Sequence, residues 1–256
     1  MQSEDLLLFA ADAARAMLES GGETYRAEDV AMSIIACQGG MEAECFATST
    51  GLMLSFMGAD GRVRSVVRRI KKRGMNLERV SRIDRMVRDL ATDKIDIEEA
   101  SKELDVIERS KEKPWWIKAL ASAVGAGFFT LLFGGIALDA LAAAVIGTMV
   151  ALLSQGIVKL HLPDFLISLA GGALAAGASL GLQAYGVPID VNLVIIGVIM
   201  LLVPGVAITN AIRDTIAGDL VAGLARGADA FLTAASISAG AGGTFTLWQL
   251  LQKGGL

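Results

Sequence analysis

Long apolar runs distinguish the second half of the chain from the first. From Ala119 onward, isolated charges separate five uncharged windows, at residues 119–138, 140–158, 165–189, 191–212 and 230–252. A helix needs about 20 residues to cross the ~30 Å hydrocarbon core of a bilayer, and each window is close to that length. The pattern predicts a membrane region over 114–256 with five helices, near 117–137, 139–158, 165–184, 191–209 and 230–250.

The first half carries shorter periodicities. Helical patterns cover residues 4–20 and 24–37, and short runs with β-branched and aromatic residues follow at 44–70. Asn76 and Asp96 are N-cap signals for two further helices. GADG at 58–61 is typical of a hairpin turn. We therefore expect an α+β cytoplasmic domain over 1–113, with two helices, a small antiparallel sheet and two more helices. The whole chain is predicted to be an α-helical polytopic membrane protein with five transmembrane helices.

The distribution of charge predicts the topology. Of the 23 Lys/Arg residues, 19 lie at or before Lys118, where they are balanced by 21 Asp/Glu, so nucleic acid is not an implied partner. Beyond Lys118, Lys159, Arg213 and Arg226 lie in every second connection between the predicted spans, as the positive-inside rule expects of cytoplasmic loops. This indicates a multi-pass protein of the cell (inner) membrane with the N-terminal domain cytoplasmic and the C-terminus outside.

Residues needed for several kinds of catalysis are missing from the sequence. The single histidine, His161, lies in a predicted membrane loop, so a Ser-His-Asp arrangement has no base. No phosphate-binding glycine loop of the P-loop kind occurs, and two cysteines with one histidine do not make a zinc site. We expect no enzyme activity, no cofactor and no metal site. An aspartyl hydrolase using Asp214 and Asp219 is a further alternative.

The segment MLLVPGVAITNAIRDTIAGDLVAGLARGAD, 200–229, combines an apolar helix with charges. Pro204 and Gly205 should break the helix, because proline lacks the N–H that the preceding turn needs. Discontinuous helices with polar side chains form binding sites in many transporters, whereas an amphipathic helix at the membrane surface would keep its charges in water. Both interpretations remain open. The candidate substrate- or proton-binding residues are Asn210, Arg213, Asp214, Asp219, Arg226 and Asp229.

Part of this segment, LLVPGVAITNAIRDTIAGDLVAGLAR (201–226), resembles the hallmark segment of the threonine/serine exporter family, in which VPG is followed by Asn, an acid and GLAR. SGGETYRAEDV (20–30) and RGMNLERVSRI (73–83) are similar to two further segments of that family. The resemblance implies a subunit of a secondary, proton-coupled exporter of small polar metabolites, threonine and serine first. Exporters of succinate-like dicarboxylates and a membrane-anchored sensor or scaffold are the alternatives.

The resemblance also implies partners. Full-length exporters of the family carry a second membrane half, so this chain looks like the larger subunit of the split two-component branch. We expect a small separate membrane subunit, a small-molecule substrate, the lipid bilayer and a higher oligomer as partners. An amino acid would need one Arg and one Asp, such as Arg213 with Asp214, whereas a dicarboxylate would need Arg213 and Arg226 together. Asp214 or Asp219 could carry the proton.

Overall fold

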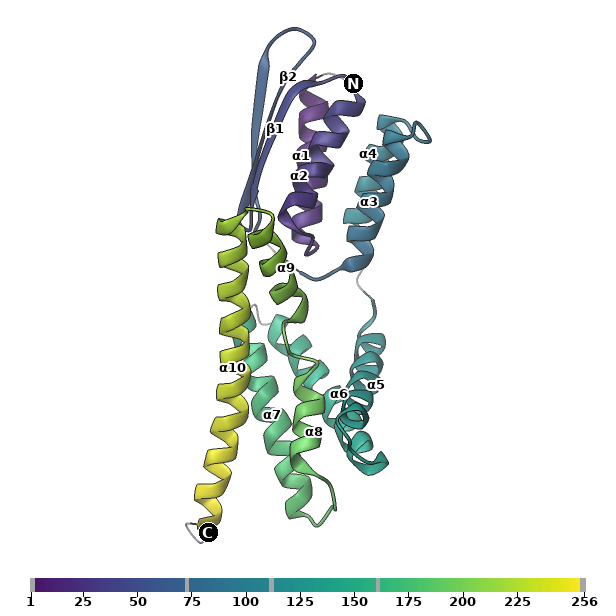
Figure 1. Ribbon diagram of the computed structural model, residues 1–256. Helices are drawn as coiled ribbons and strands as arrows, with labels where there is room; N and C mark the ends of the chain where they lie inside the picture. Colours follow the sequence, from purple (N-terminus) through teal and green to yellow (C-terminus); the bar gives the residue numbers. More distant parts are fainter. Residues whose placement is uncertain (1–2, 72–73, 111–112, 160–161, 254–256) are drawn as a thin grey trace. The chain divides into compact units, whose positions relative to one another are not determined.

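The chain folds into two compact units. The computed structural model describes residues 3–71, 74–110, 113–159 and 162–253 (Figure 1), so His161 lies outside the described residues. The N-terminal unit comprises Met1–Lys111 and Ile208–Gly227, and the helical unit comprises Glu112–Ala207 and Ala228–Leu256. The first break lies close to the predicted boundary at 113/114. Residues 208–227, which the sequence placed in the membrane region, fold with the N-terminal unit.

The N-terminal unit combines helices with a three-stranded sheet. Its elements before the linker are α1 (Ser3–Glu19), α2 (Thr24–Cys37), β1 (Met41–Thr48), β2 (Gly51–Met57), β3 (Val63–Arg69), α3 (Leu77–Ala91) and α4 (Ile97–Glu108). The sheet is antiparallel in the order β1-β2-β3, with Leu54 opposite both Cys45 and Val66. Gly61, at φ +70°, lies in the turn between β2 and β3, within the predicted hairpin. The small antiparallel sheet expected from the sequence is present.

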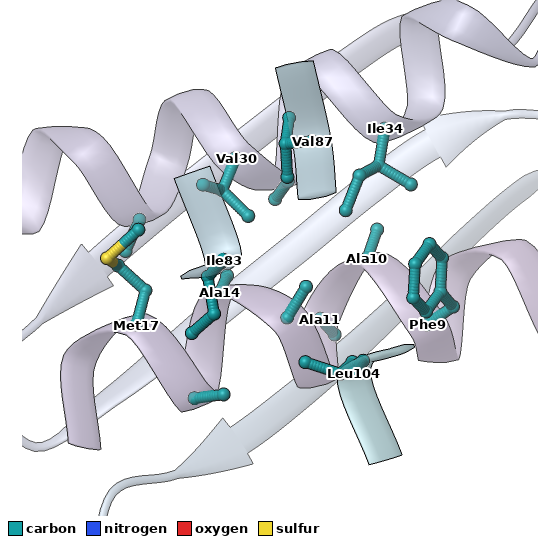
Figure 2. Packing of buried hydrophobic residues seen from close by; sticks show 14 of the residues in the cluster. Phe9, Ala10, Ala11, Ala14, Met17, Val30, Ile34, Ile83, Val87 and Leu104 are labelled. Atoms are coloured by element: carbon teal, nitrogen blue, oxygen red, sulfur yellow. The ribbon is translucent and has the colours of Figure 1, made fainter. Parts of the chain in front are cut away.

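Helix α1 is the centre of the hydrophobic core. It contacts α2, α3, α4, β2 and β3, and ten of its 17 residues are buried. Figure 2 shows Ala10, Ala11 and Ala14 of α1 among side chains from α2, α3 and α4. Alanine lets neighbouring elements approach closely on every side of the helix, so an alanine-rich helix can be enclosed on all faces. The end of α1 and the start of α2 therefore belong to the buried core of this unit.

The helical unit contains most of the long apolar helices. Its helices are α5 (Trp115–Leu132), α6 (Ala137–Lys159), α7 (Asp164–Ala184), the short α8 (Val191–Ile199) and, from Ala228 onward, α10 (Leu220–Lys253). Among the described residues four helices are long and apolar enough to cross a membrane, namely α5, α6, α7 and α10. The count of five stays a prediction. Its fifth helix, expected near 230–250, is the later part of α10, which begins at Leu220.

The fourth expected span, 191–209, is divided in the structure. Helix α8 ends at Ile199 and α9 (Gly205–Ile216) begins six residues later. The amides of Leu201 and Leu202 donate to Val198 and Ile199 in tight turns. Pro204 has no N–H to donate to the carbonyl of Met200, so the helical bonding pattern cannot continue through it. As a result neither α8 nor α9 has the length of a complete span.

Small residues let α7 and α10 pack closely. A Cβ at Gly240 would lie 2.0 Å from the backbone oxygen of Leu169, and one at Gly172 would lie 2.5 Å from the oxygen of Ile237. On α7 these close approaches to the α10 backbone lie at Leu169 and Gly172. Such contacts are typical of helices that associate in lipid, where small residues allow backbones to meet.

Asp139 links two turns of the helical unit. Its buried side chain, 3% exposed, accepts hydrogen bonds from the amides of Ile136 (2.9 Å) and Asp190 (2.8 Å). Asp190 in turn caps α8 by accepting from the amides of Asn192 and Leu193. One carboxylate therefore caps α6 and holds the start of α8 beside it.

We expect Asp139→Asn to lower the free energy of unfolding by about 1–3 kcal/mol, because the amide group turns a donor toward one of the two N–H groups. The thermal unfolding midpoint of the purified protein measures this. Asp164→Asn, at the exposed start of α7, is the matched control and should cost less than about 1 kcal/mol. Equal effects of the two substitutions would contradict the assignment.

Candidate functional site

The polar segment 208–227 forms a helical hairpin within the N-terminal unit. Helix α9 ends at Ile216, Gly218 takes φ +97° in the turn, and α10 begins at Leu220. A Cβ at Gly223 would lie 2.2 Å from the Thr215 hydroxyl oxygen, so only glycine allows the two helices to come this close. The amide of Asp219 donates to the carbonyl of Asp214 at 2.8 Å and closes the turn.

The side chain of Asp214 is the buried centre of the site. It is 0% exposed, and Arg226 contacts it with Nε 3.0 Å from Oδ2. Thr24, at the start of α2, donates its amide to Oδ1 and its hydroxyl to Oδ2, both at 3.3 Å. Buried charges are stable only when they are paired and hydrogen-bonded, and this carboxylate has both kinds of partner.

Three more side chains of the hairpin bind the loop between α1 and α2. Asn210 donates to the carbonyl of Gly21 at 3.1 Å, and Arg226 donates to that of Gly22 at 2.8 Å. Arg213 lies 2.7 Å from a carboxylate oxygen of Glu23. Together with the Asp214 contacts, these bonds engage four consecutive residues. We call this set the Asp214 network: Gly21, Gly22, Glu23, Thr24, Asn210, Arg213, Asp214 and Arg226.

The two glycines of this loop are required by its conformation. Gly21 has φ +87°, in the left-handed region that other residues rarely occupy. A Cβ at Gly22 would lie 2.6 Å from the sulfur of Met17. The SGGET motif therefore has a structural reason: it turns the chain sharply so that two carbonyls and the Thr24 amide face the hairpin.

Arg213 and Glu23 form the more accessible part of the network. The Arg213 side chain is 58% exposed, whereas that of Glu23 is 7% exposed. Glu23 also pairs with Arg26, which in turn contacts Asp84. Burial opposes ionisation of Glu23, but its backbone hydrogen bond and the two arginines together lower the pKa of this carboxyl. Glu23 is therefore held as an anion.

The pKa values of two further carboxyls nearby are raised. Burial raises the pKa of Asp219, and the negative charge of Asp214 adds to the effect. Burial also raises the pKa of Glu28, opposed by a hydrogen bond from the Ala47 amide and reinforced by the charges of Asp219, Asp29 and Asp214. These groups hold protons more readily than ordinary surface acids. Sequence reasoning named Asp219 but missed Glu28, although it lies in the quoted SGGETYRAEDV segment.

The remaining predicted residues lie apart from the Asp214 network. Asp229 is exposed and belongs to the portion of α10 that folds with the helical unit. Pro204 precedes α9, and Gly205 is its first residue. The structure thus brings Asn210, Arg213, Asp214 and Arg226 together, with Asp219 beside them.

We expect Arg226→Gln to lower the free energy of unfolding by about 3–5 kcal/mol, because it leaves the buried Asp214 carboxylate without its cation. Arg213→Gln is the matched control in the same hairpin. Its guanidinium is exposed, and Glu23 keeps Arg26 as a second cation, so the loss should be smaller, about 1 kcal/mol or less. Thermal unfolding of both variants measures the difference, and similar midpoints would show that the Asp214–Arg226 pair is not a buried structural bond.

The raised pKa of Asp219 predicts a pH-dependent stability. An acid whose pKa is higher in the folded state contributes no penalty below its unfolded pKa and destabilises the fold as the pH rises through the folded pKa. We therefore expect Asp219→Asn to raise the unfolding midpoint relative to the parent at pH 7. The difference should vanish as the pH falls below the ordinary aspartate range. A difference that stays constant from pH 7 to pH 3 would contradict this origin.

Comparison with known proteins gives the family of the chain. Residues 8–248 match the family model described as "Putative threonine/serine exporter". A curated relative from Mycobacterium tuberculosis, described as "Probable threonine/serine exporter", is 26% identical over 234 residues. That alignment covers 89% of this chain and 43% of the relative, so the chain spans less than half the relative's length. No solved structure matches. Because the family match covers nearly the whole described sequence, this chain belongs to the threonine/serine exporter family.

Proposed function

We propose that this chain is part of a secondary exporter that carries small polar metabolites, threonine and serine first, out of the cell. The observation that carries the proposal is the family match over residues 8–248, which spans both the loop and the hairpin of the Asp214 network. The name of the M. tuberculosis relative supports the choice of substrates to test first. The four apolar helices are consistent with a multi-pass membrane protein.

In this proposal export is coupled to protons through Asp219 and Glu28. Their raised pKa values favour uptake and release of a proton, which a coupling carboxyl requires. The charged groups that act on them are Asp214, paired with Arg226, and Asp29. Binding of one proton would remove a negative charge from this group of partly buried acids. The electrostatic repulsion between the acids of α2 and those of the hairpin would then be weaker.

Asn210, Asp214 and Arg226 then position this hairpin. Their side chains already bond one another or the loop Gly21–Thr24, so direct contact with a substrate would require these bonds to break. Arg213, with its exposed side chain, is the member most able to meet a metabolite from solution. We assign Asn210, Asp214 and Arg226 to holding the hairpin in place and the exposed Arg213 to the approach of the substrate.

The proposal includes a separate small membrane subunit and a cytoplasmic N-terminal unit. More than half of the M. tuberculosis relative lies outside the match, which leaves room for a second membrane component in the working exporter. The lysines and arginines that precede α5 favour the cytoplasmic side for the N-terminal unit. The competing proposal is a membrane-anchored sensor or scaffold that moves no solute.

Counterflow in proteoliposomes tests the proposal. The full chain, with and without its candidate small subunit, is loaded with unlabelled solute and offered labelled threonine, serine or succinate. We expect counterflow of threonine or serine that requires the partner. Absence of counterflow with all three solutes, from folded and paired protein, would contradict the exporter function and favour the sensor or scaffold.

The same vesicles test proton coupling. We expect Asp219→Asn and Glu28→Gln to retain exchange of solute but to lose export driven by an imposed pH gradient, because a neutral side chain cannot bind and release the coupled proton. Asp105→Asn, an exposed acid of α4, is the control and should behave as the parent. A parent-like response of both variants to the gradient would rule out these carboxyls as the coupling groups.

A further inference from the structure

A cavity of about 150 Å³ lies within the N-terminal unit, where the end of α1 meets the start of α3 and the end of α4. The polar residues that line it are Arg15, Glu19, Ser20, Arg79 and Glu108. None of the six candidate residues predicted from the sequence is among the described residues of this lining. An apolar cavity of ~150 Å³ holds a benzene-sized molecule, and serine is of comparable size. The cavity is therefore large enough for a small polar metabolite.

The hydroxyl of Ser20 is a buried polar group in this lining. Ser20 is 4% exposed and follows the last residue of α1. Its amide donates to the carbonyl of Ala16, and its carbonyl accepts from the amide of Asn76. Among the described residues, no hydrogen bond reaches its hydroxyl. Buried hydroxyls normally have a hydrogen-bond partner, and a ligand in the cavity would supply one.

Two arginines and two glutamates share the lining with this hydroxyl. Arg79 donates through Nε and Nη2 to Ser110 and to the carbonyl of Glu108, so the N–H groups of Nη1 remain for a ligand. Arg15 donates to Oε2 of Glu19 at 3.4 Å and to Oε1 of Glu108 at 2.9 Å. The second oxygen of each carboxylate accepts no hydrogen bond from the described residues. The cavity therefore offers both donors and anionic acceptors.

The arginines do not fully offset the negative charge around Glu108. Burial raises the pKa of this carboxyl, although the neighbouring Arg15 lowers it. Three further acids raise it: Asp12, Glu19 and Asp105. A positive group beside Glu108 and Glu19 would reduce this repulsion, which favours a ligand with an ammonium group.

We propose that this cavity binds a small α-amino acid. The carboxylate of the ligand accepts from the Ser20 hydroxyl and from Nη1 of Arg79, and the ammonium group donates to the remaining oxygens of Glu19 and Glu108. Arginine suits a carboxylate, and ionised carboxylates can only accept. The two positive and two negative side chains of the described lining balance the charges of a zwitterion. A dicarboxylate or a simple amine would leave one pair unmatched.

The cavity lies beside two segments that connect with other parts of the chain. Ser20 directly precedes the loop that holds the Asp214 network, and Arg79 binds the carbonyl of Ser110, shortly before α5 begins. A bound amino acid would therefore stabilise both segments. Binding itself does not depend on the exporter function, whereas a role in regulating export rests on that proposal.

Isothermal titration of the full chain in nanodiscs tests the site with L-serine, succinate and ethanolamine. Succinate lacks the ammonium group, and ethanolamine lacks the carboxylate. We expect serine to bind about 10-fold more tightly than either. Ser20→Ala and Glu19→Gln should each raise the Kd for serine about 10-fold, because each weakens a hydrogen bond to a charged group of the ligand. Ser33→Ala, at a half-buried serine of α2 outside this lining, is the control and should bind as the parent does.

Hydrogen exchange shows where the serine binds. The amides of Gly74 and Asn76 donate to the carbonyls of Glu19 and Ser20, both at 2.9 Å. Serine should slow their exchange in the parent but not in Ser20→Ala, which should unfold at the parent temperature or higher. Equal Kd values in the parent and both variants would overturn the proposal. So would binding of succinate or ethanolamine as tight as that of serine, or protection that leaves these two amides unchanged.

Counterflow separates this inference from the proposed function. If the parent transports serine but serine does not slow exchange at Gly74 and Asn76, the exporter function stands and the cavity assignment is wrong. If the parent transports none of the three solutes but binds serine in a way that depends on Ser20, the exporter function fails and the site stands.

Discussion

A carboxylate that is withdrawn from water must have a cation and hydrogen-bond donors, and Asp214 obtains them from two distant parts of the chain. Arg226 comes from the second helix of the hairpin, and Thr24 lies 190 residues earlier. The pair can be satisfied only if residues 208–227 fold against the loop between α1 and α2. This requirement explains why a segment between membrane-type helices belongs to the N-terminal unit. It also explains why the loop has two glycines, since only a sharp turn presents its carbonyls to Asn210 and Arg226.

The fold of the hairpin also connects it to the helix break at Pro204. The chain leaves the helical unit at Ala207 and returns to it at Ala228, so the break before Gly205 and the start of α10 are covalently joined to the hairpin. Asp219 lies in the turn of that hairpin, and the nearby Asp214 charge makes its proton harder to remove. Asp219 therefore lies in the segment that connects two parts of the helical unit along the chain.

Local patterns in the sequence predicted the elements well where each element depends on its own residues. Asn76 accepts from the amide of Arg79, and Asp96 forms a capping box with Glu99, as their spacing indicated. The long apolar windows correspond to α5, α6 and α7, and Pro204 lies where α8 and α9 are separate. A helix through Arg226 and Asp229 was expected after the break, but not that it continues without interruption into the fifth expected span, as α10 does from Leu220 to Lys253. Sequence patterns also identified Asn210, Arg213, Asp214 and Arg226 but not their partners. A contact between Thr24 and Asp214 leaves no periodic signal.

Hydrogen exchange of the full chain in lipid nanodiscs tests the central claim most directly. If the Asp214 network folds the hairpin into the N-terminal unit, the Thr24 amide should exchange as slowly as the core of α1. The amides of α9 should lose protection together with it in Asp214→Asn. A hairpin that lies on the membrane surface as an independent amphipathic helix would give a different result. The Thr24 amide would then exchange rapidly in the parent, or its rate would not respond to the substitution, and either outcome would contradict the account.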